Sequence, residues 1–187
     1  MLTVILSGGG SRRMGRDKAM LPYGGKTLLQ YLIDQYSTHG PVAVSVNEKG
    51  RFPFEGAVEL VDRYPDLGPL NGIVSAFAET DADAIFLTAT DLPYGDYALA
   101  EKLNALRGKA DACILKRGKK GMEPLYAIYG RNCAGAAMDC LAAGQKSFFD
   151  LLERLNVRYV NPEEMTEFDL EHILTNVNTP EEFEKLQ

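Results

Sequence analysis

The part of the chain best suited to chemistry lies near its N-terminus, where glycines precede a group of cations. A β-branched run over residues 3–6 leads into Gly8, Gly9 and Gly10, and four cations follow: Arg12, Arg13, Arg16 and Lys18. Because glycine has no Cβ, such a turn permits positive φ and lets backbone N–H groups approach a ligand. Arginine and lysine add charge-assisted donors for phosphate oxygens. The stretch therefore predicts a binding loop for a polyphosphate such as a triphosphate, rather than for a single carboxylate.

Two common phosphate-binding motifs do not fit this loop. A Walker A loop needs Lys and then Ser or Thr after its last glycine, but Arg16 and Asp17 follow Gly15. A dinucleotide-binding fingerprint needs a third glycine where Arg13 stands. The remaining alternative is a glycine-rich turn with surface arginines.

One carboxylate further along the chain is placed to hold a metal ion. Asp91 follows an apolar run over residues 84–88 and precedes Pro93. If that run is a buried strand, Asp91 lies at its carboxyl end, where a hard oxygen can bind Mg²⁺ against phosphate oxygens. The alternative is an aspartate that caps the turn over residues 92–95.

The elements that would position these groups alternate between strand and helix. Seven short apolar runs read as strands: residues 3–6, 42–46, 58–61, 84–88, 112–115, 125–129 and 157–160. Helical stripes of apolar residues lie between several of them, over residues 28–36, 73–77 and 98–106. Buried strands that alternate with helices predict an α/β fold of three layers with a mostly parallel sheet. The glycine loop and Asp91 would then meet at one edge of that sheet.

Composition narrows the class of protein. The chain has 187 residues, 45% of them hydrophobic and 25% charged, which indicates a single folded domain over residues 1–187. Its net charge of −6 disfavours nucleic-acid binding. No signal sequence or membrane-spanning run is evident, so we expect a cytoplasmic protein that does not bind membranes. Cys113, Cys133 and Cys140 have no metal-binding spacing, and we expect small buried thiols.

The motifs together resemble those of the molybdenum cofactor guanylyltransferases, usually called MobA, in the nucleotidyltransferase superfamily. Residues 6–18 match the superfamily's L-x-G-G-x-x-x-R-M-G-x-D-K loop without a gap. Four further motifs follow in the family's order, over residues 68–73, 90–94, 123–126 and 176–181. The resemblance covers almost the whole chain and implies a Rossmann-like αβα nucleotidyltransferase domain. Ser7 and Asn71 depart from it, since alanine is common at both positions.

The resemblance also implies roles for individual residues. Lys18 and Arg13 would stabilise the β- and γ-phosphates as pyrophosphate leaves, with Ser7, Gly8, Gly9 and Gly10 in the same nucleotide-binding loop. Asp91 and Asn178 would hold Mg²⁺, although Asn178 also suits the turn before a helix. The guanosine pocket would be lined by Leu6, Asn47, Asp62, Gly68, Pro69 and Leu70. Asp62 is alternatively a strand-end cap near Arg63.

The implied reaction is Mg²⁺-dependent transfer of GMP from GTP to molybdopterin or the molybdenum cofactor, which yields the guanine dinucleotide cofactor and pyrophosphate. Other proteins of molybdenum cofactor biosynthesis are implied partners. A cytidylyl- or sugar-phosphate nucleotidylyltransferase is the nearest alternative, and a non-catalytic nucleotide-binding domain is another. The cationic stretch over residues 116–121 separates two strand-like runs and reads as a hairpin tip that binds the acceptor, or as a solvated turn.

Overall fold

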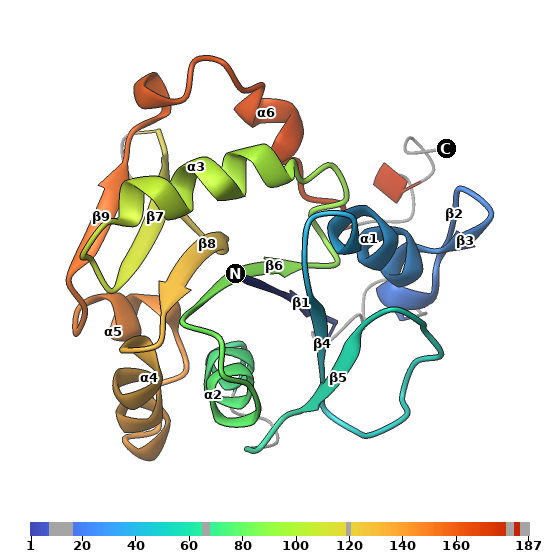
Figure 1. Ribbon diagram of the computed structural model, residues 1–187, viewed down its shortest axis with the longest axis horizontal. Coiled ribbons are helices and arrows are strands. Elements are labelled where there is room, and N and C mark those ends of the chain that lie inside the picture. The colour runs from blue at the N-terminus through green and yellow to red at the C-terminus, as the bar shows by residue number, and fades with distance from the viewer. Residues whose placement is uncertain (8–16, 65–67, 119–120, 179–181, 184–187) are drawn as a thin grey trace.

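A seven-stranded sheet forms the centre of the computed structural model, which describes residues 1–7, 17–64, 68–118, 121–178 and 182–183 (Figure 1). Its strand order is β5-β4-β1-β6-β8-β7-β9. Every pairing is parallel except those of β8, which runs antiparallel to both β6 and β7. The strands are β1 (Leu2–Leu6), β4 (Val42–Val46), β5 (Val58–Val61), β6 (Ala84–Ala89), β7 (Ala112–Arg117), β8 (Gly121–Gly130) and β9 (Val157–Val160). The predicted mostly parallel sheet is confirmed.

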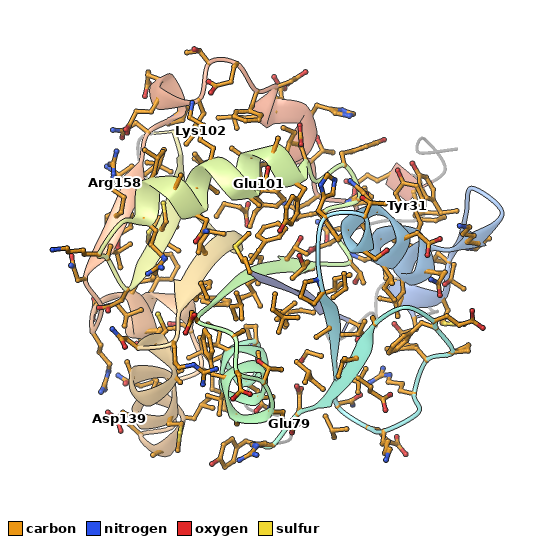
Figure 2. The ribbon with its side chains drawn as sticks, viewed as in Figure 1. Tyr31, Glu79, Glu101, Lys102, Asp139 and Arg158 are labelled. Carbon is orange, nitrogen blue, oxygen red and sulfur yellow. The ribbon has the colours of Figure 1, made fainter. Side chains whose placement is uncertain are left out.

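Helices cover both faces of the sheet and complete the three layers (Figure 1). One face packs against α1 (Leu28–Ser37), α3 (Tyr97–Arg107) and α6 (Leu170–Ile173). The other packs against α2 (Leu70–Glu79), α4 (Cys133–Ala142) and α5 (Phe148–Leu152). The charged residues Glu79, Glu101 and Asp139 lie on the outer sides of their helices (Figure 2). None of the helices in the described ranges is long and apolar enough to cross a bilayer.

Short elements link this frame to the candidate site. The 3-10 helix η2 (Lys18–Met20) follows the glycine loop, and the small hairpin of β2 (Pro22–Tyr23) and β3 (Lys26–Thr27) leads into α1. A second 3-10 helix, η3 (Pro162–Glu164), follows β9.

The local sequence accounts for the regular elements. The stripe that predicts α1 is fully buried, and the side chain of Thr27 caps the helix by accepting from the Gln30 backbone N–H. Helix α2 begins at Leu70, three residues before the predicted start, and buries its first eight residues.

All three cysteines are buried as expected, and burial raises the pKa of the Cys133 thiol to about 12.

Strand β8 is longer than the predicted run over residues 125–129, because its pairing with β7 extends to Gly121. The register shifts from the pair Cys113 and Ile128 to the pair Leu115 and Glu123, so Pro124 lies in an irregular stretch of the ladder. Proline cannot donate to a ladder and is tolerated at such irregularities. The predicted hairpin over residues 116–121 is thereby confirmed, with Lys119 and Lys120 outside the described residues.

Candidate active site

The site is built where β1 and β6 end side by side. The two strands are parallel, with Leu6 paired to Ala89, and the Thr90 N–H donates to the Leu6 carbonyl at 3.2 Å. Ser7 and Asp91 therefore follow neighbouring strands at the same edge of the sheet, as predicted. Residues Gly8, Gly9, Gly10 and Arg13 of the glycine loop lie outside the described residues, so their roles stay predictions.

The C-terminal segment brings Lys18, Asp91 and Asn178 together. Lys18 Nζ donates to the Val177 carbonyl oxygen at 2.6 Å and to Asn178 Oδ1 at 3.2 Å, across 159 and 160 residues of sequence. The Val177 N–H in turn donates to the backbone oxygen of Asp91 at 2.9 Å. The Asn178 N–H donates to Glu182 Oε2 at 2.6 Å. Three predicted site residues thus lie within one small cluster.

The charges in this cluster are partly desolvated. Burial raises the pKa of the Asp91 carboxyl, and the nearby Lys18 ammonium opposes that shift. Burial likewise lowers the pKa of Lys18, against the attraction of Asp91 and Glu182. Asp91 Oδ1 is buried and accepts no hydrogen bond from the described part of the chain. A buried carboxylate oxygen without a partner is costly unless a cation or a donor completes it.

These oxygens suit a hard divalent cation. Asp91 supplies an anionic oxygen that has no hydrogen-bond partner among the described residues, and Asn178 supplies a neutral amide oxygen that accepts from the Lys18 ammonium. No group of three or more His, Cys, Asp or Glu side chains gathers for a metal within the described ranges. Magnesium commonly takes only one or two carboxylates and completes its shell with phosphates and water, so this small donor set fits Mg²⁺.

The buried Glu123 forms an ion pair near this cluster with the exposed Arg117, a pair that the sequence did not assign. Glu123 is 7% exposed, and its Oε2 accepts from Arg117 Nη1 at 3.1 Å. Arg117 Nη2 also donates to the Leu174 carbonyl at 2.8 Å, just before the segment that carries Asn178. Burial raises the pKa of Glu123, the Arg117 charge opposes this, and the negative charge of Asp91 adds to it. The motif over residues 123–126 marked Glu123 as notable, but no pattern predicted its partner.

A chain of hydrogen bonds joins Ser7, Ser45 and Asp62 where the nucleoside pocket is predicted. Ser7 Oγ donates to the Ser45 carbonyl at 2.6 Å, and Ser45 Oγ donates to Asp62 Oδ1 at 2.7 Å. Burial raises the pKa of Asp62, and the Ser45 hydroxyl opposes the shift. Arg63 contacts Glu79 instead, with Nε 3.8 Å from Oε1. Ser45 had no signal in the sequence, because it lies inside an apolar strand.

The loop that begins at Gly68 is shaped by close backbone contacts. Gly68 has φ +79°, and an added Cβ would lie 3.5 Å from the Lys146 carbonyl oxygen. Pro69 precedes α2 as its N-cap residue, and the side chain of Leu70 is fully buried in the core. Leu6 packs closely against the same helix, since an added Cβ at Gly72 would lie 2.4 Å from Leu6 Cδ2.

Asn71, which departs from the family pattern, has a structural role. Its Nδ2 donates to the Tyr64 carbonyl at 2.8 Å, and its Oδ1 accepts from the Tyr64 N–H at 3.3 Å. The amide therefore fastens the loop that precedes α2 to the start of that helix.

Asn47 lies at the surface and is linked to Asp17 through Arg51. Arg51 donates to Asn47 Oδ1, and its Nη2 donates to Asp17 Oδ2 at 2.8 Å. Asp17 directly precedes Lys18. Arg51 is a further cation at this edge that sequence reasoning missed.

Comparisons with known proteins agree with this architecture. Residues 3–158 match the family model described as "MobA-like NTP transferase domain". The chain is 33% identical to a molybdenum cofactor guanylyltransferase of Syntrophotalea carbinolica, over 97% of this chain and 88% of that protein. It is 31% identical to a probable molybdenum cofactor guanylyltransferase of Carboxydothermus hydrogenoformans, over 99% of this chain and 94% of that protein.

Solved structures show the same fold. The molybdopterin-guanine dinucleotide biosynthesis protein A of Archaeoglobus fulgidus superposes with a TM-score of 0.85 and 26% identity, over 100% of this chain and 96% of that one. A 2-C-methyl-D-erythritol 4-phosphate cytidylyltransferase of Thermus thermophilus shares the fold alone, with a TM-score of 0.62 and 16% identity over 84% of this chain and 87% of that one. With a family model that covers most of its length and full-length relatives above 30% identity, the chain belongs to the MobA-like NTP transferase family.

Proposed function

We propose that this protein transfers GMP from GTP to the terminal phosphate of molybdopterin or of the molybdenum cofactor, with Mg²⁺, and releases pyrophosphate. The observation that carries the proposal is the cluster of Lys18, Asp91 and Asn178 beside the end of β1. The names of the relatives support the choice of base and acceptor.

Asp91 and Asn178 would hold the metal ion through their Oδ1 atoms. Magnesium, when bound there, would neutralise phosphate oxygens of the nucleotide. Burial makes the Asp91 carboxylate a strong electrostatic partner for such a cation, because little solvent screens the pair.

Lys18 would bind the phosphates that become pyrophosphate. An ammonium has three N–H donors, and charged phosphate oxygens are stronger acceptors than the neutral oxygens of Val177 and Asn178 that it contacts here. A preorganised donor of this kind stabilises the charge that develops on the leaving group. Arg13 would add a second cation from the same loop.

The chemical step needs no nucleophile from the protein. An oxygen of the acceptor phosphate attacks the α-phosphorus of GTP, a new P–O bond forms, and the bond to the bridging oxygen of the β-phosphate breaks. The acceptor oxygen is already anionic near neutral pH, so the site has only to position the reactants and neutralise their charge.

Asp62 would recognise the base. Its Oδ1 is held by Ser45, which orients the carboxylate toward donors such as N1–H and the 2-amino group of guanine. Adenine and cytosine do not present that pair of donors, so this contact would favour guanine.

The test is turnover with molybdopterin and MgCl₂, in which GTP, CTP and ATP are compared at equal concentration and pyrophosphate release is measured. GTP should be preferred by at least about tenfold, the value of one hydrogen-bonded contact to a charged group. Preference for CTP would favour the cytidylyltransferase alternative. Nucleotide binding with no turnover for any acceptor would favour the non-catalytic alternative.

A further inference from the structure

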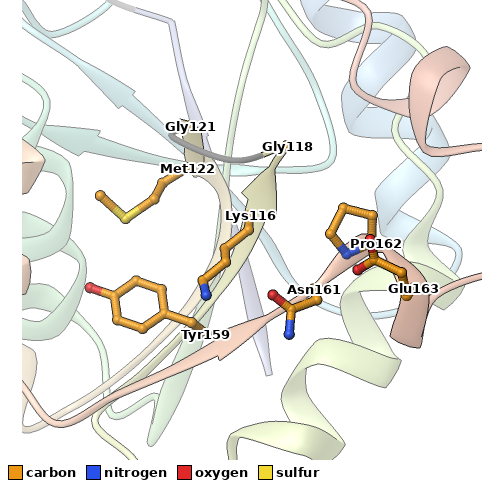
Figure 3. A pocket seen from close by; sticks show the side chains of 8 residues that line it. All are labelled: Lys116, Gly118, Gly121, Met122, Tyr159, Asn161, Pro162 and Glu163. Carbon is orange, nitrogen blue, oxygen red and sulfur yellow. The ribbon is translucent and has the colours of Figure 1, made fainter.

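A concave site lies near β9, the edge strand of the sheet that is separated from β1 by β6, β8 and β7. It is a cavity of about 590 Å³ between the β7–β8 hairpin and the turn that joins β9 to η3. Eight residues line it (Figure 3): Lys116, Gly118, Gly121, Met122, Tyr159, Asn161, Pro162 and Glu163. None of the residues predicted for the nucleotide or the metal ion is among them.

We propose that this cavity binds the acceptor of the reaction, a flat fused heteroaromatic ring that carries an anionic arm, with its ring on Tyr159 and its anionic arm toward Lys116. The inference rests on the proposed function for the identity of the acceptor, while the ligand class follows from the lining itself.

Tyr159 and Met122 supply a surface for a ring. Both are half-buried side chains that pack on the core beneath α4 and α5, so the aromatic face is held in place from behind. A larger residue at position 121 would clash with the backbone, because a Cβ added at Gly121 would lie 2.8 Å from the Arg117 carbonyl oxygen. Gly118 and Gly121 therefore line the cavity without adding side chains to it.

Lys116 is the cation of the cavity, and Figure 3 shows it between Tyr159 and Asn161. Its Nζ lies 5.8 Å from the centre of the Tyr159 ring, and it pairs with no carboxylate of the described residues. A cation–π contact at a solvent-accessible site is worth about 0.5–1 kcal/mol, whereas a hydrogen bond to a charged group is worth about 1.5–3 kcal/mol. An anionic ligand would therefore draw Lys116 off the ring and open the face of Tyr159.

Glu163 and Asn161 supply acceptors and donors for the edge of the ring. The turn that carries them is fixed by the Asn161 N–H, which donates to Glu164 Oε1 at 2.9 Å, and by the ion pair of Arg158 with Glu164. The Glu163 carboxylate can accept from N–H groups at one edge of a heteroaromatic ring, as carboxylates commonly do with amidine-like donors.

The strand order places the cavity two strands from β6, the strand that ends just before Asp91. Lys116 is on β7 and Tyr159 on β9, and only β8 separates β7 from β6, which ends just before Asp91. At about 4.8 Å per strand, β7 is about 10 Å from β6. A fused-ring molecule that binds on β9 with its anionic arm toward β7 therefore points that arm along the sheet in the direction of β6.

The β7–β8 hairpin contributes residues both to the cavity and to the surroundings of the Asp91 cluster. Lys116 and Arg117 are consecutive in a strand, so they face opposite sides of the sheet. Arg117 pairs with Glu123 and with the Leu174 carbonyl on the side of the metal cluster, while Lys116 lines the cavity. Of the four cations that the sequence assigned to the acceptor, Arg117 thus has a structural role, and Lys119 and Lys120 lie outside the described residues.

The test uses pterin-6-carboxylate, a stable fluorescent anionic heteroaromatic, titrated into the full-length protein, with GTP titrated separately. Lys116→Gln should weaken binding of the probe by about 10-fold or more, as expected for a lost charge-assisted hydrogen bond. Tyr159→Leu, which keeps an apolar side chain against the core, should also weaken it. Lys109→Gln, which removes an exposed lysine at the end of α3, is the matched control and should bind like wild type.

The outcomes separate this proposal from the proposed function. Loss of probe affinity in both variants with unchanged GTP affinity supports the cavity as the acceptor site. No binding by the wild type, or equal binding by Lys116→Gln and Lys109→Gln, overturns it even if turnover with GTP is intact. If the wild-type protein binds the probe through Lys116 but neither binds nor turns over GTP, the proposed ligand class of the cavity stands. The proposed function is then contradicted instead.

Discussion

At the scale of single residues, the site depends on a buried carboxylate oxygen of Asp91 and on the partly buried ammonium beside it. Asp91 Oδ1 accepts no hydrogen bond from the described residues, and the Lys18 ammonium donates to oxygens of Val177 and Asn178. A buried carboxylate oxygen of this kind costs stability and persists where a ligand completes it. The cluster is therefore better explained by a function than by a contribution to folding.

Asp91→Asn tests the role of the carboxylate. Turnover at saturating GTP and MgCl₂ should fall by at least about 100-fold, since loss of an anionic ligand weakens metal binding as much as or more than loss of a supporting contact. The melting temperature should change little, because the variant removes both the burial cost of the charge and its attraction to Lys18. Pyrophosphate release and thermal unfolding are the two measurements. A rate near that of the wild type would contradict the assignment.

At the scale of elements, close packing and the contacts of Arg117 hold the site in place. Helix α2 lies against the end of β1 because Gly72 leaves room for Leu6. The β7–β8 hairpin is tied to the C-terminal segment through Arg117. Each of these contacts joins elements that are distant in sequence, so each can be tested by a single substitution.

Gly72→Ala should destabilise the protein by about 1–3 kcal/mol through overpacking, since the new Cβ would lie 2.4 Å from Leu6 Cδ2. GTP should also bind more weakly, because Leu6 borders the nucleotide loop. Gly135→Ala in α4 is the matched control. Gly135 is exposed, has nothing within 4 Å of an added Cβ, and should gain about 0.5–1 kcal/mol from helix propensity. Urea unfolding measures both, and equal effects of the two substitutions would refute the packing argument.

Arg117→Gln tests the ion pair with the buried Glu123 and predicts a pH dependence of stability. It leaves Glu123 buried without its cation, at a cost of about 1 kcal/mol because Arg117 itself is 41% exposed. Without the guanidinium, burial should raise the pKa of Glu123 further. A carboxyl whose pKa is higher in the folded state takes up protons on folding, so its stability deficit grows as pH rises through that pKa.

The deficit of Arg117→Gln relative to wild type should therefore be smaller at pH 5 than at pH 8 in urea unfolding. Lys102→Gln, which breaks the surface pair of Lys102 with Glu167, is the control and should show little change at either pH. A deficit that does not vary with pH would mean that the Glu123 charge is not the cause.

At the scale of the whole molecule, the seven-stranded sheet contributes residues to two hydrophobic cores. Separate hydrophobic clusters lie on its two faces, one beneath α1 and α3 and the other beneath α2 and α4. Strand β1 contributes to both, with Ile5 in one cluster and Val4 in the other. Unfolding of either face would expose the sheet that the other face needs.

We accordingly propose that residues 1–187 form a single domain that unfolds in one cooperative step. Far-ultraviolet circular dichroism and tyrosine fluorescence should give the same urea midpoint. The chain has nine tyrosines and no tryptophan, so its fluorescence reports on tyrosine alone. Two separated transitions would indicate that the two faces are independent units.

The sequence by itself determined much of the frame and the position of Asp91 at the end of a buried strand. Local apolar patterns predicted three of the strands, over residues 42–46, 58–61 and 157–160, and the buried face of α1. Such patterns are local because a strand that packs in a sheet requires a short apolar run, and a helix that packs on a sheet requires an apolar stripe. The place of Asp91 at the end of β6 followed from the same reasoning. Gly68, Pro69 and Asn178 were predicted as site residues from motif resemblance rather than from periodicity.

Only the tertiary structure decided which side chains meet. The contacts of Lys18 with Val177 and Asn178 cross more than 150 residues, and those of Arg117 with Leu174 and Ser45 with Asp62 cross 57 and 17. No local pattern encodes such pairs, since they arise from strand order and register. The cavity around Lys116 and Tyr159 has the same origin, because β7 and β9 are neighbours only in the folded sheet.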